Sequence, residues 1–234
     1  MTLDLRNCGF GNILLMAAGH LRNGGVSLYH DAPEAELGIL DLSHFVLDPD
    51  ASRVDPKLNA RYCNLSTLRD PAVARVMRRI ANGSFGVANG SFSPEESPKK
   101  NAADAGFCFR VRNPALDGDV EFMNEAAIEA MIRLMTRYKK PFACSNDRAV
   151  LARVTERVPW AITVDCASWG ARNAPDHVAQ WLALSKCPVI FHGVGGNGSV
   201  TSTFAPTAAI FGGCEALVGI DPFGNACYGD SYHW

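Results

Sequence analysis

Residues Phe191 to Gly213 read FHGVGGNGSVTSTFAPTAAIFGG, and they indicate how the C-terminal half of the chain is built. The segment passes from an apolar strand through a loop of glycine and hydroxyl side chains into a helix of small residues, with Pro206 in its first turn. Glycine lets the backbone approach a ligand closely, and the N–H groups of a helix start attract anions. The segment therefore predicts a phosphate-binding loop, although a strand-to-helix connection that binds nothing would have the same pattern.

Strands and helices alternate regularly on both sides of this loop. The expected strands cover residues 105–112, 141–145, 160–165, 188–193 and 216–220, and the expected helices cover residues 121–139, 147–158 and 176–187. Strands that alternate with helices through short connections form a parallel sheet with helices on both faces. Ligands bind such a sheet beyond the carboxyl ends of its strands, so the loop lies where a ligand is expected.

The N-terminal half begins with the same succession of elements. A strand at 2–6 leads through a glycine turn at 7–12 into an apolar helix at 13–21, and a second strand follows at 26–30. Strand, glycine turn and helix in this order are typical of the start of a nucleotide-binding fold. A further helix, with proline in its first turn, is expected at 71–81.

The two regular parts are separated by residues 82–104. This segment holds two copies of Asn-Gly-Ser-Phe and has little periodicity, which is typical of a linker or loop. We therefore predict an α/β chain of two Rossmann-like halves with parallel sheets, residues 1–100 and residues 105–234.

The composition excludes several classes of protein. The 234 residues are 47% hydrophobic and 20% charged with a net charge of −2, so no basic field favours nucleic acid. Eight cysteines without a C-x-x-C pair argue against a metal site and against a disulfide scaffold. No signal peptide and no apolar run of membrane-spanning length is recognisable. We expect a cytoplasmic protein with no metal site, no nucleic-acid partner and no membrane span.

Polar side chains follow two further strand ends. In AGFCFRVR, residues 105–112, the alternation of a strand places Arg110 and Arg112 on the same face. The next strand ends at Ser145, and Asp147 follows in a Ser-Asn-Asp turn. Guanidinium groups grip a pyrophosphate bidentately, and a turn carboxylate can accept from a base or ribose. This set suits a nucleoside diphosphate, although the arginines could also form a solvated strand edge and Asp147 could cap a helix.

Several of these segments, taken in order and spacing, resemble the fucosyltransferase superfamily, which includes the α-1,2, α-1,6 and protein O-fucosyltransferases. The motifs that carry the resemblance are GFGN at 9–12, RVRN at 110–113, CSNDRAVL at 144–151, HVAQWLALSKCPVIF at 177–191 and STFAPTAAIFGG at 202–213. Arg110 stands where the family has histidine, in its His-x-Arg strand. The match covers roughly residues 105–215 together with the glycine turn near the N-terminus.

The resemblance implies a GT-B fold whose C-terminal half binds the donor, a GDP-sugar. By analogy Arg112 would hold the diphosphate during catalysis, with Arg110 beside it. The other residues that the motifs assign to the donor are Gly9, Gly11, Asn12, Ser145, Asp147, Ser202, Thr203 and Phe204. The implied reaction is an inverting, metal-independent transfer of a sugar, with fucose from GDP-fucose as the first expectation, to a hydroxyl of a glycan or glycoprotein. No cofactor besides the donor is implied.

The sequence leaves the catalytic base open. An inverting transfer needs one group that takes the proton of the acceptor hydroxyl. His30, next to Asp31 at a strand end, is one candidate, and Asp117 or Asp119 after the arginine strand is another. His20 lies on an apolar helix and is expected to be packed rather than catalytic.

Two other functions fit parts of the sequence. Gly193, Gly195 and Gly198 form a G-x-G-x-x-G pattern after a strand, and Asp221 follows about twenty residues later, which is typical of an NAD(P)-dependent oxidoreductase. The helix expected near Pro206 begins late for that pattern. A catalytically silent nucleotide-sugar-binding module is the third interpretation, because the histidine of the family's motif is replaced.

Overall fold

The computed structural model describes residues 1–6, 8–31, 37–63, 67–68, 70–81, 103–112, 123–164, 175–194 and 202–227. Contacts divide the chain into two compact units, Met1–Glu95 and Glu96–Tyr232, and each unit is described by itself. Most of the predicted linker, residues 82–102, lies outside the described residues. The division into halves at residues 100 and 105 therefore stays a prediction.

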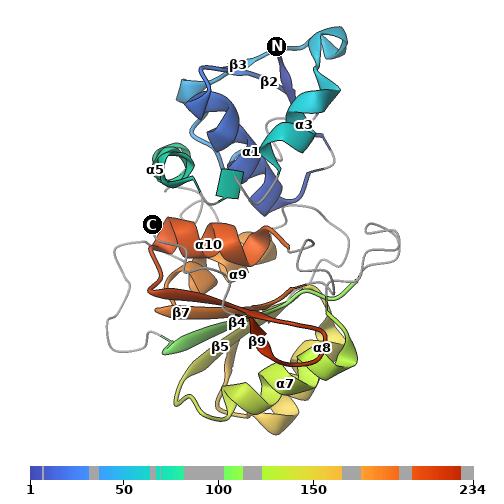
Figure 1. The fold of residues 1–234 in the computed structure, drawn as a ribbon, viewed down its shortest axis with the longest axis vertical. Helices are drawn as coiled ribbons and strands as arrows, with labels where there is room; N and C mark the ends of the chain where they lie inside the picture. The colour runs from blue at the N-terminus through green and yellow to red at the C-terminus, as the bar shows by residue number, and fades with distance from the viewer. Residues whose placement is uncertain are drawn as a thin grey trace. The chain divides into compact units, whose positions relative to one another are not determined.

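The N-terminal unit is built around a small parallel sheet. Its strands are β1 (Leu3–Asp4), β2 (Ser27–Tyr29) and β3 (Val46–Leu47), in the order β1-β2-β3. Its helices are α1 (Phe10–Arg22), α3 (Pro56–Tyr62) and α5 (Pro71–Ile80), with short 3-10 turns at Leu42–His44 and Ala51–Arg53. In Figure 1 α3 and α5 lie beside α1, whose residues from Ile13 to His20 are all buried.

Helix α5 begins where the sequence predicts. The carboxylate of Asp70 accepts a hydrogen bond from the backbone N–H of Ala72 at 2.8 Å, and Pro71 occupies the first helical position. Both features stabilise a helix start, since proline lacks an N–H there and the cap satisfies a donor that has no partner inside the helix.

Helix α1 begins earlier than predicted. It starts at Phe10 instead of Ile13, so the GFGN segment belongs to its cap and first turn instead of a separate turn. Burial of the Phe10 ring explains the difference, together with the hydrogen bond from the Ile13 N–H to the Gly9 carbonyl at 3.0 Å. Strand β1 is also shorter than the predicted strand at 2–6.

The C-terminal unit contains a six-stranded sheet in the order β6-β5-β4-β7-β8-β9. The strands are β4 (Ala105–Phe109), β5 (Pro141–Ser145), β6 (Ile162–Thr163), β7 (Val189–Gly193), β8 (Ala216–Ile220) and β9 (Ala226–Cys227). All neighbours pair in parallel except β8 and β9, which are antiparallel. The predicted α/β class with two parallel sheets is confirmed, whereas the edge strand β9 had no counterpart in the prediction.

Two pairs of helices cover the faces of this sheet. Figure 1 shows α7 (Glu125–Met135) and α8 (Arg148–Arg157) on one face, and α9 (Pro175–Ser185) and α10 (Phe204–Gly212) on the other. Phe107 and Phe191 stack at 4.8 Å in the core under α7 and α8. This layering is what strands buried on both faces require, and it leaves the carboxyl ends of β4, β5 and β7 at one edge.

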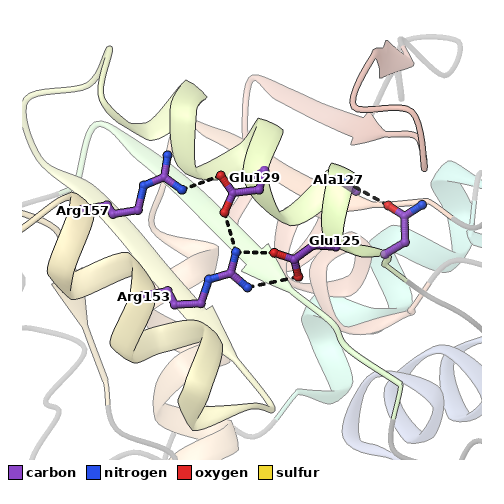
Figure 2. A network of polar contacts seen from close by, with 6 residues as sticks. Glu125, Ala127, Glu129, Arg153 and Arg157 are labelled. Carbon is purple, nitrogen blue, oxygen red and sulfur yellow. Dashed lines mark hydrogen bonds and ion pairs between the residues drawn. The ribbon is translucent and has the colours of Figure 1, made fainter.

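Ion pairs join α7 to α8 on the outer surface. Figure 2 shows Arg153 between Glu125 and Glu129, and Arg157 bound to Glu129. Hydrogen bonds to Glu125 and Glu129 raise the pKa of Arg153 above its usual value. The network therefore joins the outer surfaces of the two helices that cover this face of the sheet.

Within the described residues, none of the helices is long and apolar enough to cross a membrane.

Candidate functional site

The carboxyl edge of the C-terminal sheet gathers the polar residues that the sequence singled out. Strand β4 lies between β5 and β7, so the segment 110–112 after β4 has the end of β5 on one side and the end of β7 on the other. Residues 202–204, at the start of α10, belong to the connection that leaves β7. Residues 195–201 of the predicted phosphate loop lie outside the described residues.

The side chain of Asn146 holds the segment that carries the two arginines. Its Oδ1 accepts from the N–H of Val111 at 2.8 Å, and its Nδ2 donates to the carbonyl of Val111 at 2.9 Å. The amide thus makes both hydrogen bonds that a neighbouring strand would make to this residue. Strand β4 ends at Phe109, yet Arg110 and Arg112 remain attached to the end of β5 through this clamp.

The two arginines differ in what they contact. Arg110 is partly buried, and its Nη1 donates to the carbonyl of Val111 at 2.6 Å. Arg112 is exposed. The Arg110 guanidinium therefore takes part in ordering the segment, and the Arg112 side chain lies exposed just beyond the end of β4.

Ser145 and Asp147 shape the turn after β5. Asp147 is the N-cap of α8, since its Oδ1 accepts from the N–H of Ala149 at 2.7 Å, and its own N–H donates to Ser145 Oγ at 3.0 Å. Ser145 is buried. The capping role that the sequence left open for Asp147 is confirmed, and its proposed contact with a base or ribose is not tested.

The start of α10 carries no negative charge in its first turn. Thr203 is the N-cap without a capping hydrogen bond from its side chain, and Ser202 Oγ accepts from the N–H of Phe204 at 3.4 Å. Pro206 lies in the first turn, as predicted. The helix dipole places a partial positive charge at this end, which favours an anion.

Helix α9 fixes the position of α10. The ring nitrogen of Trp181 donates to Thr207 Oγ1 at 3.1 Å, and its ring lies 4.7 Å from that of Phe211. Farther along, a side chain at Gly212 would meet the carbonyl oxygen of Ser185 at 1.6 Å, so glycine is required where the two helices meet. These contacts set where the N-terminus of α10 meets the sheet edge.

His192 lies on β7, one residue before the strand ends. It pairs in register with Cys108 and Gly219, is 3% exposed, and its Nδ1 has no hydrogen-bond partner. Burial lowers its pKa to about 4, against a smaller opposing effect of a hydrogen bond with the Gly193 backbone. The imidazole is therefore neutral at neutral pH.

We predict that this histidine makes the protein sensitive to acid. Because its pKa is about 4 in the folded state and about 6.5 in the unfolded chain, the unfolded state binds the proton first as the pH falls. Stability should drop by ~2 kcal/mol between pH 7 and pH 5, and by ~3 kcal/mol in total below pH 4. Urea unfolding at both pH values measures the loss.

A His192→Gln variant provides the comparison, because it has no titrating group at this position. The part of the pH dependence that the wild type shows and the variant lacks belongs to His192. Equal pH dependence of the two proteins would contradict the prediction.

The candidate base His30 belongs to the N-terminal unit. Its side chain is 2% exposed, and its Nδ1 lies 3.4 Å from Asp31 Oδ1 at the end of β2. Asp4, at the end of β1, binds Arg6 at 2.8 Å. Burial raises the pKa of Asp4, but hydrogen bonds from Arg6 outweigh it and, with a contribution from His30, leave this pKa below its usual value.

The glycine turn lies in the same unit. Gly9 is the N-cap of α1 and has open space on its Cα, Gly11 is buried, and Asn12 Oδ1 accepts from Cys63 Sγ at 3.3 Å. The predicted roles of these three residues in donor binding are not tested. Asp117 and Asp119 lie outside the described residues.

Within one unit, the structure brings together most of the residues assigned to the donor. Arg110, Arg112, Ser145 and Asp147 lie on adjoining strand ends, and Ser202, Thr203 and Phe204 begin the helix that follows the third strand end. Sequence reasoning missed Asn146 and Trp181 as supports of this edge. Asn146 belongs to the Ser-Asn-Asp turn, of which only Ser145 and Asp147 were given a role. Trp181 belongs to the motif at 177–191, which was compared with the family without a role for its single residues.

No group of three or more His, Cys, Asp or Glu side chains that could hold a metal ion is present among the residues described.

We predict that Asn146→Ala loosens the arginine segment. The variant leaves the N–H and carbonyl of Val111 without these two hydrogen bonds, which costs about 1–3 kcal/mol locally. Native-state hydrogen exchange at the Val111 amide should accelerate about 10- to 100-fold. Asn146→Asp is the matched control, because it keeps the acceptor for the Val111 N–H. Unchanged exchange at Val111 in the alanine variant would rule out the clamp.

The structure is similar to solved fucosyltransferases. The α-1,6-fucosyltransferase NodZ co-crystallized with GDP matches with a TM-score of 0.58 and 14% identity, over 97% of this chain and 97% of NodZ. A structure of NodZ from Bradyrhizobium matches with a TM-score of 0.56 and 14% identity over the same shares. A mutant of Arabidopsis thaliana FUT1 in complex with GDP gives 0.51 and 12%, over 94% of this chain and 70% of FUT1. No protein-family model matches the sequence, and no curated protein matches it.

These similarities concern the fold. The chain has the α/β fold of these fucosyltransferases, which is the GT-B fold, so the predicted fold class and the resemblance in fold are confirmed. Sequence identity of this size carries no residue roles from one protein to the other.

Proposed function

We propose that this protein is a glycosyltransferase that moves a sugar from a nucleoside diphosphate to a hydroxyl of a glycan or glycoprotein, with GDP-fucose as the donor. The reaction is inverting and needs no metal. The donor binds at the carboxyl edge of the C-terminal sheet.

One observation carries the proposal. Asn146 holds Val111, which lies between Arg110 and Arg112, to the end of β5; this segment directly follows β4, the strand between β5 and β7. Strand β7 leads to α10, whose first turn holds no acidic residue. Guanidinium donors and helix N–H groups both bind a diphosphate without a metal. The fold similarity to fucosyltransferases solved with GDP and with GDP-fucose supports the choice of nucleotide.

The chemistry follows from these charges. The acceptor oxygen attacks C1 of the sugar from the face opposite the diphosphate, the bond between C1 and the phosphate oxygen breaks, and GDP leaves with the electron pair. Charge that develops on the departing diphosphate is stabilised by Arg112 and by the N-terminus of α10. The hydroxyl proton passes to a base.

His30 is our candidate for that base among the described residues. Its Nδ1 lies 3.4 Å from Asp31 Oδ1 at a strand end, and a carboxylate in this position can orient the ring. Asp119 remains the alternative from the sequence.

The oxidoreductase interpretation has less support. Helix α10 begins at Phe204, six positions after Gly198, whereas a dinucleotide fingerprint opens its helix directly. The acid that this interpretation needs, Asp221, accepts hydrogen bonds from the N–H groups of Phe223 and Asn225 at 2.9 and 2.8 Å. Its carboxylate orders a turn between β8 and β9.

Calorimetric titration of the wild-type protein with GDP, UDP and NAD tests the proposal. We expect GDP to bind in the micromolar range, UDP to bind more weakly, and NAD not to bind. Release of fucose from GDP-fucose to an added acceptor then separates an enzyme from a silent binding module. NAD binding without affinity for GDP would overturn the assignment, and GDP binding without transfer to any acceptor tested would favour the module.

A further inference from the structure

An open groove of about 510 Å³ runs along the N-terminal unit beside α5. It is lined by Arg22 from the last turn of α1 and by Ala72, Arg75, Val76 and Arg79 from α5. Residues three and four apart on a helix share a face, which explains how four side chains of one helix line the same groove. The packing of α5 against α1, visible in Figure 1, brings Arg22 to them.

The groove concentrates positive charge over an apolar floor. Arg22, Arg75 and Arg79 are exposed, and Ala72 and Val76 lie half-buried between them. Among the described residues, no carboxylate lies within ion-pair distance of Arg75 or Arg79. In the described part of the chain, Arg22 pairs with the carboxylate of Asp70, whose Oδ2 lies 4.0 Å from Arg22 Nε, the outer limit for an ion pair. Among the described residues, three arginines thus line the groove and one distant acid pairs with one of them.

Helix stability explains only part of this arrangement. Arg22 and Arg79 lie in the last turns of their helices, where the dipole favours a cation. Arg75 lies in the middle of α5 and gains nothing from the dipole. Like charges four residues apart, such as Arg75 and Arg79, destabilise a helix slightly. The cluster is therefore better suited to binding an anion than to stabilising α5.

We propose that this groove binds an anionic carbohydrate. A sugar ring lies on Ala72 and Val76, and its carboxylate or sulfate lies between the guanidinium groups of Arg75, Arg79 and Arg22. A planar guanidinium pairs bidentately with either oxyanion, while an aliphatic floor accepts the C–H face of a pyranose. One part of this proposal rests on the proposed function, namely that the bound acidic glycan is the acceptor of the transferase. The binding of an anionic carbohydrate in the groove does not depend on the proposed function.

The overall charge favours a small anionic ligand over nucleic acid. The chain has a net charge of −2, so the groove is a local positive patch on an otherwise acidic protein. Nucleic-acid binding draws on many phosphate contacts along an extended basic surface. Three arginines around a groove of this size can pair with only one or two anionic groups, which a small ligand supplies.

Titration of the full-length protein with matched sugars tests the proposal. The probes are tetragalacturonate, its fully methyl-esterified form, a sulfated chondroitin tetrasaccharide and a short single-stranded DNA. We expect at least one of the two anionic sugars to bind, the neutral ester to bind at least tenfold more weakly, and the affinity to fall as salt rises from 50 to 200 mM. Binding of the galacturonate shows that a carboxylate is sufficient. Because chondroitin carries uronate carboxylates besides its sulfates, binding of the chondroitin sugar without the galacturonate indicates sulfate recognition.

Variants locate the binding. The double variant Arg75→Ala/Arg79→Ala should lose at least tenfold in affinity for the anionic sugar, and Arg75→Lys/Arg79→Lys should lose less, because it keeps the charge but not the planar donor pair. Arg133→Ala, an exposed arginine of α7 in the other unit, is the control and should bind as the wild type does.

The two proposals fail separately. Absence of binding by both anionic sugars, equal binding of the methyl ester, unchanged affinity in the double alanine variant, or tighter binding of DNA would overturn the groove assignment. None of these results depends on GDP, and the double variant should keep the wild-type affinity for GDP. Sugar binding without GDP binding would leave the groove in place and overturn the transferase.

Discussion

The Arg112→Ala variant should bind GDP about 100-fold more weakly than the wild type and lose transferase activity by at least that factor. Arg112 is exposed at the end of β4, in the segment that Asn146 holds through both backbone groups of Val111. A bidentate guanidinium contact with a diphosphate contributes about 3 kcal/mol, which corresponds to this factor. The effect is larger than for an ordinary surface charge because the segment is already ordered before the ligand binds.

Calorimetry with GDP measures the change in affinity, and two further variants show which property of the arginine causes it. Arg112→Lys should lose only part of the affinity, since lysine keeps the charge without the planar pair of donors. Arg110→Ala should lose less than Arg112→Ala, because at least one N–H of Arg110 already donates to the Val111 carbonyl. Wild-type affinity in Arg112→Ala would remove this residue from the donor site, and with it the main support for the proposed function.

The Trp181→Ala variant should lower the free energy of unfolding by about 3–5 kcal/mol. Trp181 is 2% exposed, packs against Phe211, and donates to Thr207 from the facing helix. Removal of this ring leaves a cavity between α9 and α10, and both helices cover the same face of the sheet. The start of α10 should shift as a result, so GDP affinity should fall as well.

Urea unfolding monitored by the far-UV circular dichroism of the backbone gives the free energy of unfolding, because this signal does not depend on the removed tryptophan. Trp181→Phe is the matched variant: it retains an aromatic ring but loses the hydrogen bond, and should cost about 1–2 kcal/mol. Thr207 Oγ1 also donates to the Thr203 carbonyl at 2.7 Å, so the hydroxyl is still satisfied in that variant. A loss below 1 kcal/mol for alanine would show that α9 does not hold α10 in place.

The residues of the proposed donor site were easier to predict from the sequence than the residues that hold them in place. Arg110 and Arg112 could be placed at a strand end because strand alternation and the carboxyl-edge rule need only local sequence. Asp147 was recognised as a possible cap for the same reason. The clamp by Asn146 could not be seen, since an amide between a turn and a residue 35 positions away depends on which strands are neighbours.

Predictions were least accurate where packing overrides local pattern. The glycines of GFGN suggested a turn, but burial of Phe10 draws the segment into α1. Strand AGFCFRVR was expected to extend to residue 112 and ends at Phe109, because the Asn146 side chain takes the place of a further strand partner. In both places a tertiary contact of a side chain, and not the local pattern, decides where the element begins or ends.

The sequence by itself determined the order of most strands and helices, the parallel sheets, and the strand ends at which the proposed ligand-binding residues lie, because hydrophobic periodicity and helix caps are encoded within a few residues. Only the tertiary structure decided that Asn146 would hold the arginine segment, that Trp181 would fix α10, and that Arg22 would join Arg75 and Arg79 around one groove. These contacts join residues far apart in the chain, and burial of apolar surface across whole helices and strands sets their positions.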